Sequence, residues 1–263
     1  MPGRLGGMVV LNTRPARQQA RLTMLLEAEG ATVLSFPVIE IVAVEASPRP
    51  RRIAESLAQY DIMIFVSRNA VDGAFASIDV AAVPAKMRFG VIGPSTREAL
   101  TGHVADAGER LIASEPYNSE ALLGAEDLQR VDGKRILILR GQEGRNLLGD
   151  ELAARGAAVD YCEVYRRELP RRDFDAFDRL VAAAFPTLVI LTSNEGMHNL
   201  FELVDGTAAG RLRQIPWLLI SERMRESAQK LGHNAAIIIA SSASDSGIRQ
   251  AICDWANQRK IDL

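Results

Sequence analysis

The sequence predicts an α/β protein with two doubly wound parallel-sheet domains, and three observations support this prediction. Residues 10–14 return in similar form at 136–140, and residues 61–67 return at 187–193, so one offset of 126 positions relates two copies of a single unit. Short apolar runs alternate with longer helical patterns, which is typical of parallel sheets built from βα units. Runs such as 136–139 are apolar without alternation, as expected of strands covered on both faces.

The strand signals occur in the same order in both copies. We expect ten strands, five in each lobe, at residues 8–13, 32–35, 62–66, 89–92, 110–113, 135–139, 157–160, 188–191, 216–220 and 236–239. The period is too long for a solenoid. Two similar lobes in one chain imply a cleft between them, and a cleft between domains is a favoured place for a small molecule.

The connections between the lobes have extended, β-prone sequences. Segments 37–42 and 161–167 occupy equivalent places, just after the second strand of each copy. If they pair as a two-stranded β-ribbon, the chain crosses to the second lobe near residue 37 and returns near residue 165. We therefore assign residues 1–36 and 168–263 to a first, discontinuous domain and residues 43–160 to a second domain. The ribbon between them would act as a hinge that permits opening and closing.

The composition indicates a globular protein without nucleic-acid or membrane partners. With 263 residues, of which 48% are hydrophobic and 24% charged, the chain can bury two modest cores. Its net charge of −2 and pI near 6.0 argue against a nucleic-acid-binding surface. There is no signal-peptide pattern at the start, and no apolar run reaches the roughly 20 residues of a membrane helix. We therefore expect a cytoplasmic protein.

The sequence also gives no support for a metal or a nucleotide cofactor. Cys162 and Cys253 are the only cysteines, and neither lies at metal-ligand spacing. His103, His198 and His233 are scattered, and we expect each at the surface. There is no Walker loop, and no GxGxxG follows the first strand. An enzyme with this sequence would work mainly by holding and shaping a reactive substrate.

Small, polar and basic residues follow the predicted strands. In open parallel sheets ligands bind beyond the carboxyl ends of the strands, where helix N-termini offer free N–H groups to carboxylates or phosphates. These positions favour a polyanionic ligand. The candidate binding residues are Arg14, Ser67, Ser95, Thr96, Ser119, Arg140, Gly141, Ser193, Asn194 and Arg223.

Several of these residues also have a structural interpretation. Ser67, Ser119 and Ser193 each precede a helical pattern, which for each serine taken alone favours an ordinary N-cap. Arg14 and Arg140 end apolar strands in both copies, which favours a ligand or an interdomain contact over plain solvation. For Tyr165, in the predicted ribbon, two alternatives stay open: an interdomain hydrogen bond or a hydroxyl facing the cleft.

Seven short motifs, in order, resemble the uroporphyrinogen-III synthase family over about residues 8–256. Each motif is weak alone, but their order and spacing make a specific signal. The motifs are Thr13-Arg14-Pro15, Phe36-Pro37-Val38-Ile39-Glu40-Ile41, Phe65-Val66-Ser67-Arg68-Asn69-Ala70-Val71, Val91-Ile92-Gly93-Pro94-Ser95-Thr96, Glu115-Pro116-Tyr117-Asn118-Ser119-Glu120-Ala121-Leu122, Leu139-Arg140-Gly141 and Glu163-Val164-Tyr165-Arg166. The resemblance implies two flavodoxin-like lobes joined by a β-ribbon, with the first lobe discontinuous.

The resemblance also implies a function. Members are cofactor-free lyases of tetrapyrrole biosynthesis, which dehydrate and cyclise linear hydroxymethylbilane while inverting its last pyrrole ring through a spiro intermediate. The substrate is a polycarboxylate, which suits the polar and basic strand ends. The chemistry needs no protein nucleophile, so catalysis would rest on orientation and on electrostatic support for a cation. The expected partners are the substrate and, transiently, the upstream deaminase, and the expected state is a monomer.

Residue roles carry over by position. Tyr165 matches the family tyrosine proposed to assist departure of the hydroxyl, and a phenol is a plausible weak general acid. Ser67, Thr96 and Ser193 match hydroxyl positions that line the cleft, while Arg14 and Arg140 match basic strand-end positions. The second copy departs from the family pattern at Ser221-Glu222-Arg223-Met224, where a thioether replaces the expected hydroxyl. We expect Arg223 to compensate as a carboxylate ligand.

Two other functions compete with the enzyme. A two-lobed binding or sensor protein for a small polyanion explains the duplication, hinge and cleft equally well, but the missing export signal and the combined motifs disfavour it. A regulatory module of the same family would normally carry a DNA-binding extension, and no residues are left for one.

Overall fold

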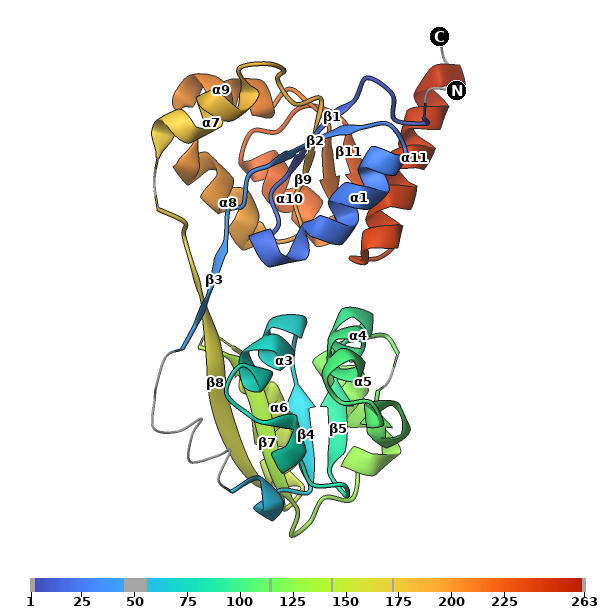
Figure 1. The fold of residues 1–263 in the computed structure, drawn as a ribbon, viewed down its shortest axis with the longest axis vertical. Coiled ribbons are helices and arrows are strands. Elements are labelled where there is room, and N and C mark those ends of the chain that lie inside the picture. Colours follow the sequence, from blue (N-terminus) through green and yellow to red (C-terminus); the bar gives the residue numbers. More distant parts are fainter. Residues whose placement is uncertain (1–2, 45–55, 114, 143, 172, 262–263) are drawn as a thin grey trace. The chain divides into compact units, whose positions relative to one another are not determined.

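The computed structural model describes residues 3–44, 56–113, 115–142, 144–171 and 173–261. The chain forms two compact units, Met1–Glu40 with Glu168–Leu263 and Ile41–Arg167. We call them the first and the second unit. Each contains one open sheet with helices on both faces (Figure 1). The predicted α/β fold with parallel sheets in two domains is confirmed.

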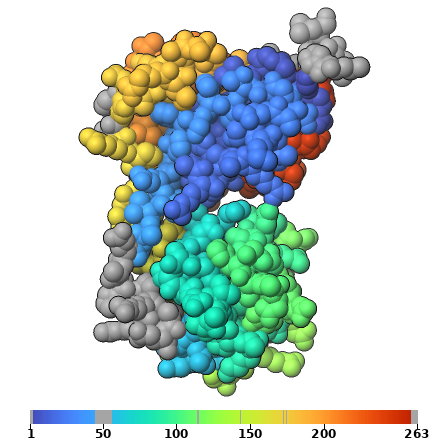
Figure 2. Space-filling view, viewed as in Figure 1, coloured from blue at the N-terminus to red at the C-terminus, as the bar shows by residue number. Residues whose placement is uncertain are grey.

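The first unit has a five-stranded sheet in the order β11-β10-β9-β1-β2, and the neighbouring strands run parallel. Its strands are β1 (Val9–Asn12), β2 (Thr32–Ser35), β9 (Leu188–Ile190), β10 (Trp217–Leu219) and β11 (Ile237–Ile239). Its helices are α1 (Ala20–Ala28), α7 (Phe174–Val181), α8 (Asn194–Leu203), α9 (Gly206–Leu212), α10 (Glu222–Lys230) and α11 (Asp245–Ile261). Helices α1 and α11, from opposite ends of the chain, pack side by side (Figure 1), and the surfaces of these segments adjoin (Figure 2).

The second unit has a six-stranded sheet in the order β3-β8-β7-β4-β5-β6. Its strands are β3 (Glu40–Ala43), β4 (Ile62–Phe65), β5 (Arg88–Val91), β6 (Leu111–Ile112), β7 (Arg135–Gly141) and β8 (Ala158–Glu168). Its helices are α3 (Arg68–Phe75), α4 (Pro94–His103), α5 (Ser119–Gly124) and α6 (Leu147–Ala154). Helix α3 packs against α4, and α5 packs against α6. All ten predicted strands are present; β8 is longer than expected, and β3 lies beside it at the edge of the sheet.

The two sheets share one topology once the repeat is taken into account. Strands β1 and β2 correspond to β7 and β8, while β4, β5 and β6 correspond to β9, β10 and β11. Apart from β3, the additional edge strand of the second sheet, each sheet then has the order second, first, third, fourth, fifth, which is the flavodoxin-like order. In each sheet the first two strands come from one copy and the last three from the other. Each sequence copy is therefore divided between the two units.

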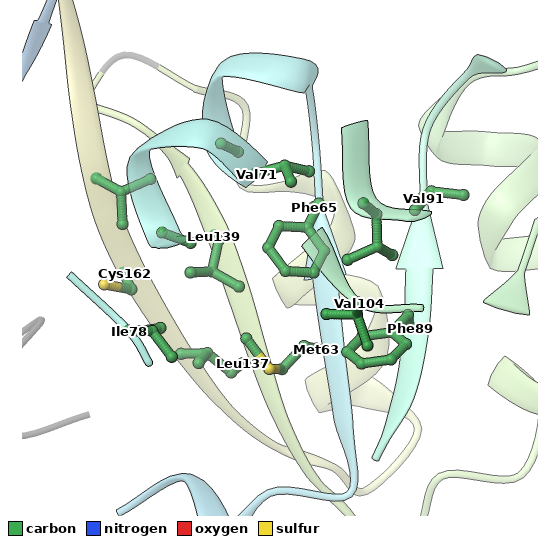
Figure 3. Close-up of a cluster of buried hydrophobic side chains, with 14 of the residues drawn as sticks. Met63, Phe65, Val71, Ile78, Phe89, Val91, Val104, Leu137, Leu139 and Cys162 are labelled. Carbon is green, nitrogen blue, oxygen red and sulfur yellow. The ribbon is translucent and has the colours of Figure 1, made fainter. Parts of the chain in front are cut away.

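The second unit shows why its strand sequences do not alternate. Along β4, Met63 and Phe65 belong to the cluster under α3 and α4, whereas Ile62 and Ile64 belong to the cluster that includes residues of α5 and α6. All four side chains are buried because successive side chains point to opposite faces and helices cover both. In Figure 3 the Phe65 side chain lies among Met63, Phe89 and Leu139. The Phe65 and Phe89 ring centroids are 6.4 Å apart.

One expectation about the histidines is wrong. His103 and His198 are exposed as predicted, but His233 is only 6% exposed. Its ring stacks on the buried Trp217 ring with centroids 4.0 Å apart. No local pattern indicates this contact, because Trp217 and His233 are 16 positions apart in the sequence. The two side chains meet only once β10 and β11 have paired. Burial lowers the pKa of His233, so the folded protein holds its ring neutral.

This burial predicts an acid-sensitive step in stability. The folded-state pKa of His233 lies below the unfolded value near 6.5, so the unfolded chain takes up the proton first. Stability from the neutral ring is fully present above pH 6.5 and is lost as the pH falls below it. We expect His233→Phe to lose less unfolding free energy than the wild type between neutral and mildly acidic pH, measured by urea denaturation. His198→Phe, at an exposed site, should keep the wild-type dependence; equal pH profiles for all three proteins would contradict the assignment.

Candidate active site at the strand ends

Ser67 and Ser193 occupy equivalent positions after β4 and β9, and both cap the helix that follows. Both have extended backbones, with φ −164° at Ser67 and φ −157° at Ser193. The Ser67 Oγ accepts from the Ala70 N–H at 3.2 Å, and the Ser193 Oγ accepts from the Gly196 N–H at 2.9 Å. The N-cap interpretation is thus correct for both serines. Each cap leaves the hydroxyl proton available as a donor.

Tyr165 on β8 lies against Ser67 within the second unit. The tyrosine is 5% exposed, and its Oη lies 3.1 Å from the Ser67 Oγ. Gly141, opposite Tyr165 across a register irregularity at the end of β7, allows this position. A Cβ at residue 141 would lie 2.9 Å from the Tyr165 Cζ, so any other residue there would push the ring away. Gly141 therefore shapes the site through the space it leaves.

The equivalent place in the first unit lacks the phenol. Residue 39, which the offset of 126 relates to Tyr165, is isoleucine. Its Cδ1 lies 3.7 Å from the position of a Cβ on Gly196, the residue whose N–H the Ser193 cap binds. The serine cap is therefore duplicated, whereas the tyrosine beside it occurs in the second unit alone.

The turn after β5 places the two predicted hydroxyls, those of Ser95 and Thr96, in different surroundings. Gly93 has φ +100°, which favours glycine, and Pro94 opens α4. Thr96 is 1% exposed, and its Oγ1 donates to the Ile92 carbonyl at 2.9 Å. Ser95 is exposed. The hydroxyl of this turn that faces solvent is thus that of Ser95.

Arg140 is held from several sides. Its Nη1 donates to the Asn146 Oδ1 at 2.8 Å and to the Gly144 carbonyl at 3.4 Å, and its Nη2 lies 3.3 Å from the Glu163 Oε1. Its guanidinium also stacks over the Tyr161 ring at 4.0 Å. Sequence reasoning missed these partners because they lie on a loop and on the neighbouring strand.

A cavity of about 380 Å³ lies beside Arg140 at the carboxyl ends of the strands of the second unit. Its lining combines apolar side chains with polar and charged ones. The residues that line it are Val66, Ile92, Tyr117, Asn118, Ser119, Glu120, Ile138, Arg140, Gly144, Arg145 and Leu148. Ser119 is the first residue of α5, and the N-cap is Asn118, whose Oδ1 accepts from the Ala121 N–H at 2.7 Å. The N-cap interpretation of Ser119 is therefore wrong, and its hydroxyl is free of that role.

In the first unit the equivalent arginine is neutralised. The Arg14 guanidinium forms an ion pair with the carboxylate of Asp245, the first residue of α11, and their side chains are only 13% and 18% exposed. Nearby, the Thr13 hydroxyl donates to the Ile190 carbonyl at 2.6 Å. The partner of Arg14 in this structure is thus a carboxylate of its own unit, whereas the sequence predicts a ligand or an interdomain contact.

The remaining candidates lie at the starts of α8 and α10. Asn194 opens α8, and its buried Oδ1 has no hydrogen-bond partner among the described residues. Ser221 caps α10 by accepting from the Met224 N–H at 3.4 Å. Met224 is buried, while Arg223 is exposed on the first turn of the helix.

The described residues contain no group of three or more His, Cys, Asp or Glu placed to hold a metal ion. Cys162 and Cys253 are buried, and neither belongs to a disulfide. Within the same part of the chain, no helix is long and apolar enough to cross a membrane.

Comparisons with known proteins agree with the motifs. The sequence model of the family described as uroporphyrinogen-III synthase HemD matches residues 20–249. The uroporphyrinogen-III synthases of Salmonella typhimurium and Escherichia coli are 33% and 32% identical over 250 residues, covering 93% of this chain and 100% of each relative.

Solved structures agree on the fold. A mutant uroporphyrinogen III synthase from the extremely thermophilic bacterium Thermus thermophilus matches with a TM-score of 0.58 at 19% identity, covering 96% of this chain and 100% of that one. The uroporphyrinogen-III synthetase of Helicobacter pylori matches with a TM-score of 0.57 at 15% identity, covering 94% and 99%. Through its matched sequence model and its relatives, the chain belongs to the uroporphyrinogen-III synthase family.

Proposed function

We propose that this protein converts hydroxymethylbilane into uroporphyrinogen III, as a cyclising lyase of tetrapyrrole biosynthesis. The observation that carries the proposal is the Tyr165–Ser67 hydroxyl pair, 3.1 Å apart, in a family motif position at the carboxyl end of a sheet. The duplicated position has Ile39 in place of the phenol. A chemical group present in only one of two duplicated places is better explained by a reaction than by symmetrical binding of a ligand.

The reaction begins with loss of the substrate hydroxyl as water, which leaves an azafulvenium cation. The cation is attacked by the substituted carbon of the terminal pyrrole, which gives a spiro intermediate; fragmentation and re-closure then give the type III isomer. A proton is needed for the departing hydroxyl, and one is released from the terminal ring when the macrocycle closes. The proton donor is thereby regenerated, and no protein nucleophile is used.

In this proposal the Tyr165 phenol supplies the proton or hydrogen bond to the departing hydroxyl. Ser67 assists because its Oγ already accepts from the Ala70 N–H, so its own proton is available to the Tyr165 Oη. When Ser67 donates in this direction, the phenol proton is free for the substrate. The positive end of the α3 dipole would further stabilise negative charge that develops on the phenol oxygen.

The carboxylates of the substrate need donors at the strand ends. We propose Ser95, Ser119, Arg140 and Arg223 as side-chain ligands, because each is exposed or adjoins the cavity. Asn194 and Ser193 would contribute at the start of α8. Arg14 would act only after release of Asp245, and Thr96 and Gly141 would shape the backbone around the ligand.

Several finer features are also proposals. Segments 37–42 and 161–167 would act as a hinge, which the unit boundaries after residues 40 and 167 support. The enzyme would act as a monomer in the cytoplasm and receive its substrate in transient contact with the upstream deaminase. Sedimentation with and without that deaminase would test the oligomeric state and the contact.

The isomer composition of the product tests the proposed reaction. Hydroxymethylbilane, generated in situ by its deaminase, closes unaided to the type I isomer. With this protein present, we expect predominantly type III after oxidation and chromatographic separation of the uroporphyrins. Type I alone from a folded sample would instead favour the non-catalytic binding protein.

Tyr165 and Ser67 can be tested together. We expect Tyr165→Phe to lower kcat by about tenfold to 100-fold, at or below the lower end of general acid–base contributions, with little change in KM. Ser67→Ala should also lower kcat, because the phenol then loses its hydrogen-bond donor.

Ser193→Ala provides the matched control for kcat, since it removes an equivalent cap with no tyrosine beside it. As a proposed ligand of the substrate, Ser193 would affect KM instead. Each alanine variant should cost about 1 kcal/mol of stability through the lost cap. Both variants lose the stability of a cap, but only Ser67→Ala should also show a clear reduction in kcat. Equal kcat values in the two variants would contradict the role of Ser67.

Arg223 is tested separately as the replacement for the missing hydroxyl. We expect Arg223→Ala to raise KM several-fold while kcat stays close to the wild type, because a carboxylate ligand is lost. Lys230→Ala removes the same charge from the exposed far end of α10 and should leave KM unchanged. If both variants behave like the wild type, Arg223 is not a ligand.

A further inference from the structure

The two arginines at equivalent strand ends face different neighbours. Arg14 follows β1 and Arg140 lies near the end of β7, at the common offset of 126, and the same offset relates Asp245 to Ser119. Asp245 and Ser119 are also structurally equivalent, because each is the first residue of its helix, α11 or α5. The first unit therefore has a carboxylate where the second unit has a serine hydroxyl.

This single difference has a direct consequence in the structure. In the first unit the Asp245 carboxylate pairs with Arg14, and both side chains are largely buried. In the second unit Ser119 and Arg140 both line the cavity of about 380 Å³. Ser119 is smaller than aspartate and carries no charge. The place that a carboxylate of the chain fills in one unit is thus open in the other.

We infer that this cavity is a binding site for a carboxylate side chain of the substrate. The Asp245 carboxylate, at the equivalent place in the first unit, is the kind of group that the cavity would accept. The inference deepens the proposed function, because the identification of the carboxylate with the substrate rests on that function. Arg140 and Arg145 supply positive charge at the cavity, and among the described residues Glu120 is the one acidic residue in its lining. Glu163, which pairs with Arg140, does not line the cavity.

The surroundings of Arg140 suit such a site. Its Nε is buried and has no hydrogen-bond partner among the described residues. Asn146 and the Tyr161 ring hold the guanidinium in place, so little side-chain entropy is lost when an anion binds. The apolar side chains of Val66, Ile92 and Ile138 lower the local polarity, which strengthens a charge pair. A volume of about 380 Å³ exceeds a single carboxylate group and leaves room for the arm that carries it.

The sharpest test places a carboxylate of the chain in the second unit as well. Ser119→Asp reproduces the residue found at 245, which the first unit shows to be compatible with a helix start. Its carboxylate should pair with Arg140 and occupy the site. Ser119→Asn is the matched control, since its side chain is of similar size but uncharged.

The probe is uroporphyrin I, a fluorescent polycarboxylate that cannot undergo the cyclisation. We expect Ser119→Asp to bind it about tenfold more weakly than Ser119→Asn does, as for the loss of one charge-assisted contact. With the true substrate, Ser119→Asp should raise KM far more than it changes kcat. The difference between the Asp and Asn variants should shrink as salt screens the charges.

Two outcomes would overturn the inference: equal binding of the probe by the Asp and Asn variants, and no binding of the probe by the folded wild type. Failure of the proposed function is distinguishable from both. A wild type that binds the probe with the expected dependence on residue 119, yet yields only the type I isomer, would retain the carboxylate site and lose the synthase reaction. A wild type that makes the type III isomer, with substitutions at residue 119 that do not affect binding, would retain the synthase reaction and lose the carboxylate site.

Discussion

The parallel pairing of strands from different repeat copies is the constraint on which the rest of this structure depends. In the first unit β1 pairs with β9, and in the second β4 pairs with β7, with Val10 beside Leu188 and Ile62 beside Ile136. These central pairs join the copies within each sheet. They also bring the carboxyl ends of strands far apart in sequence to one edge, where Ser67 meets Tyr165 and Arg14 meets Asp245. Without this exchange, neither contact would form.

Duplication gives the site an internal reference, because each candidate residue can be compared with its copy. Ser67 and Ser193 have both kept the cap, which a helix start requires whatever the function. The residues beside them have diverged: Tyr165 corresponds to Ile39, and Ser119 corresponds to Asp245. Structural demands act on both copies alike, so a difference between equivalent positions separates functional residues from structural ones. In both comparisons the second unit has the group suited to a ligand, a phenol in one case and an open cavity beside Arg140 in the other.

The fold class, the strands and the family could be predicted from the sequence because they depend on local patterns and on order along the chain. Runs such as 62–65 are apolar throughout since helices cover both faces of each sheet. Two contacts that the sequence does not predict, those of His233 and Arg14, involve partners far away along the chain. His233 was expected at the surface because its stacking on Trp217 requires β10 and β11 to pair. Ser119 was considered as a cap, although Asn118 also has a capping side chain and lies one residue earlier. The Arg14–Asp245 ion pair joins residues 231 positions apart, beyond the reach of local patterns.

Charge placement connects these findings to the substrate. A chain with a net charge of −2 cannot attract a polycarboxylate through its overall field, so positive charge must be held locally, at a place that an anion can reach. The first unit does not leave Arg14 available, because Asp245 neutralises it. In the second unit Arg140 pairs with Glu163, but it also lines the cavity, and Asn146 and Tyr161 fix its guanidinium. An anion held there would bring substrate to the same edge of the sheet as the Tyr165 phenol. Under the proposed function, the unit that carries the phenol would therefore also hold the substrate in one orientation, which is what a reaction controlled by orientation requires.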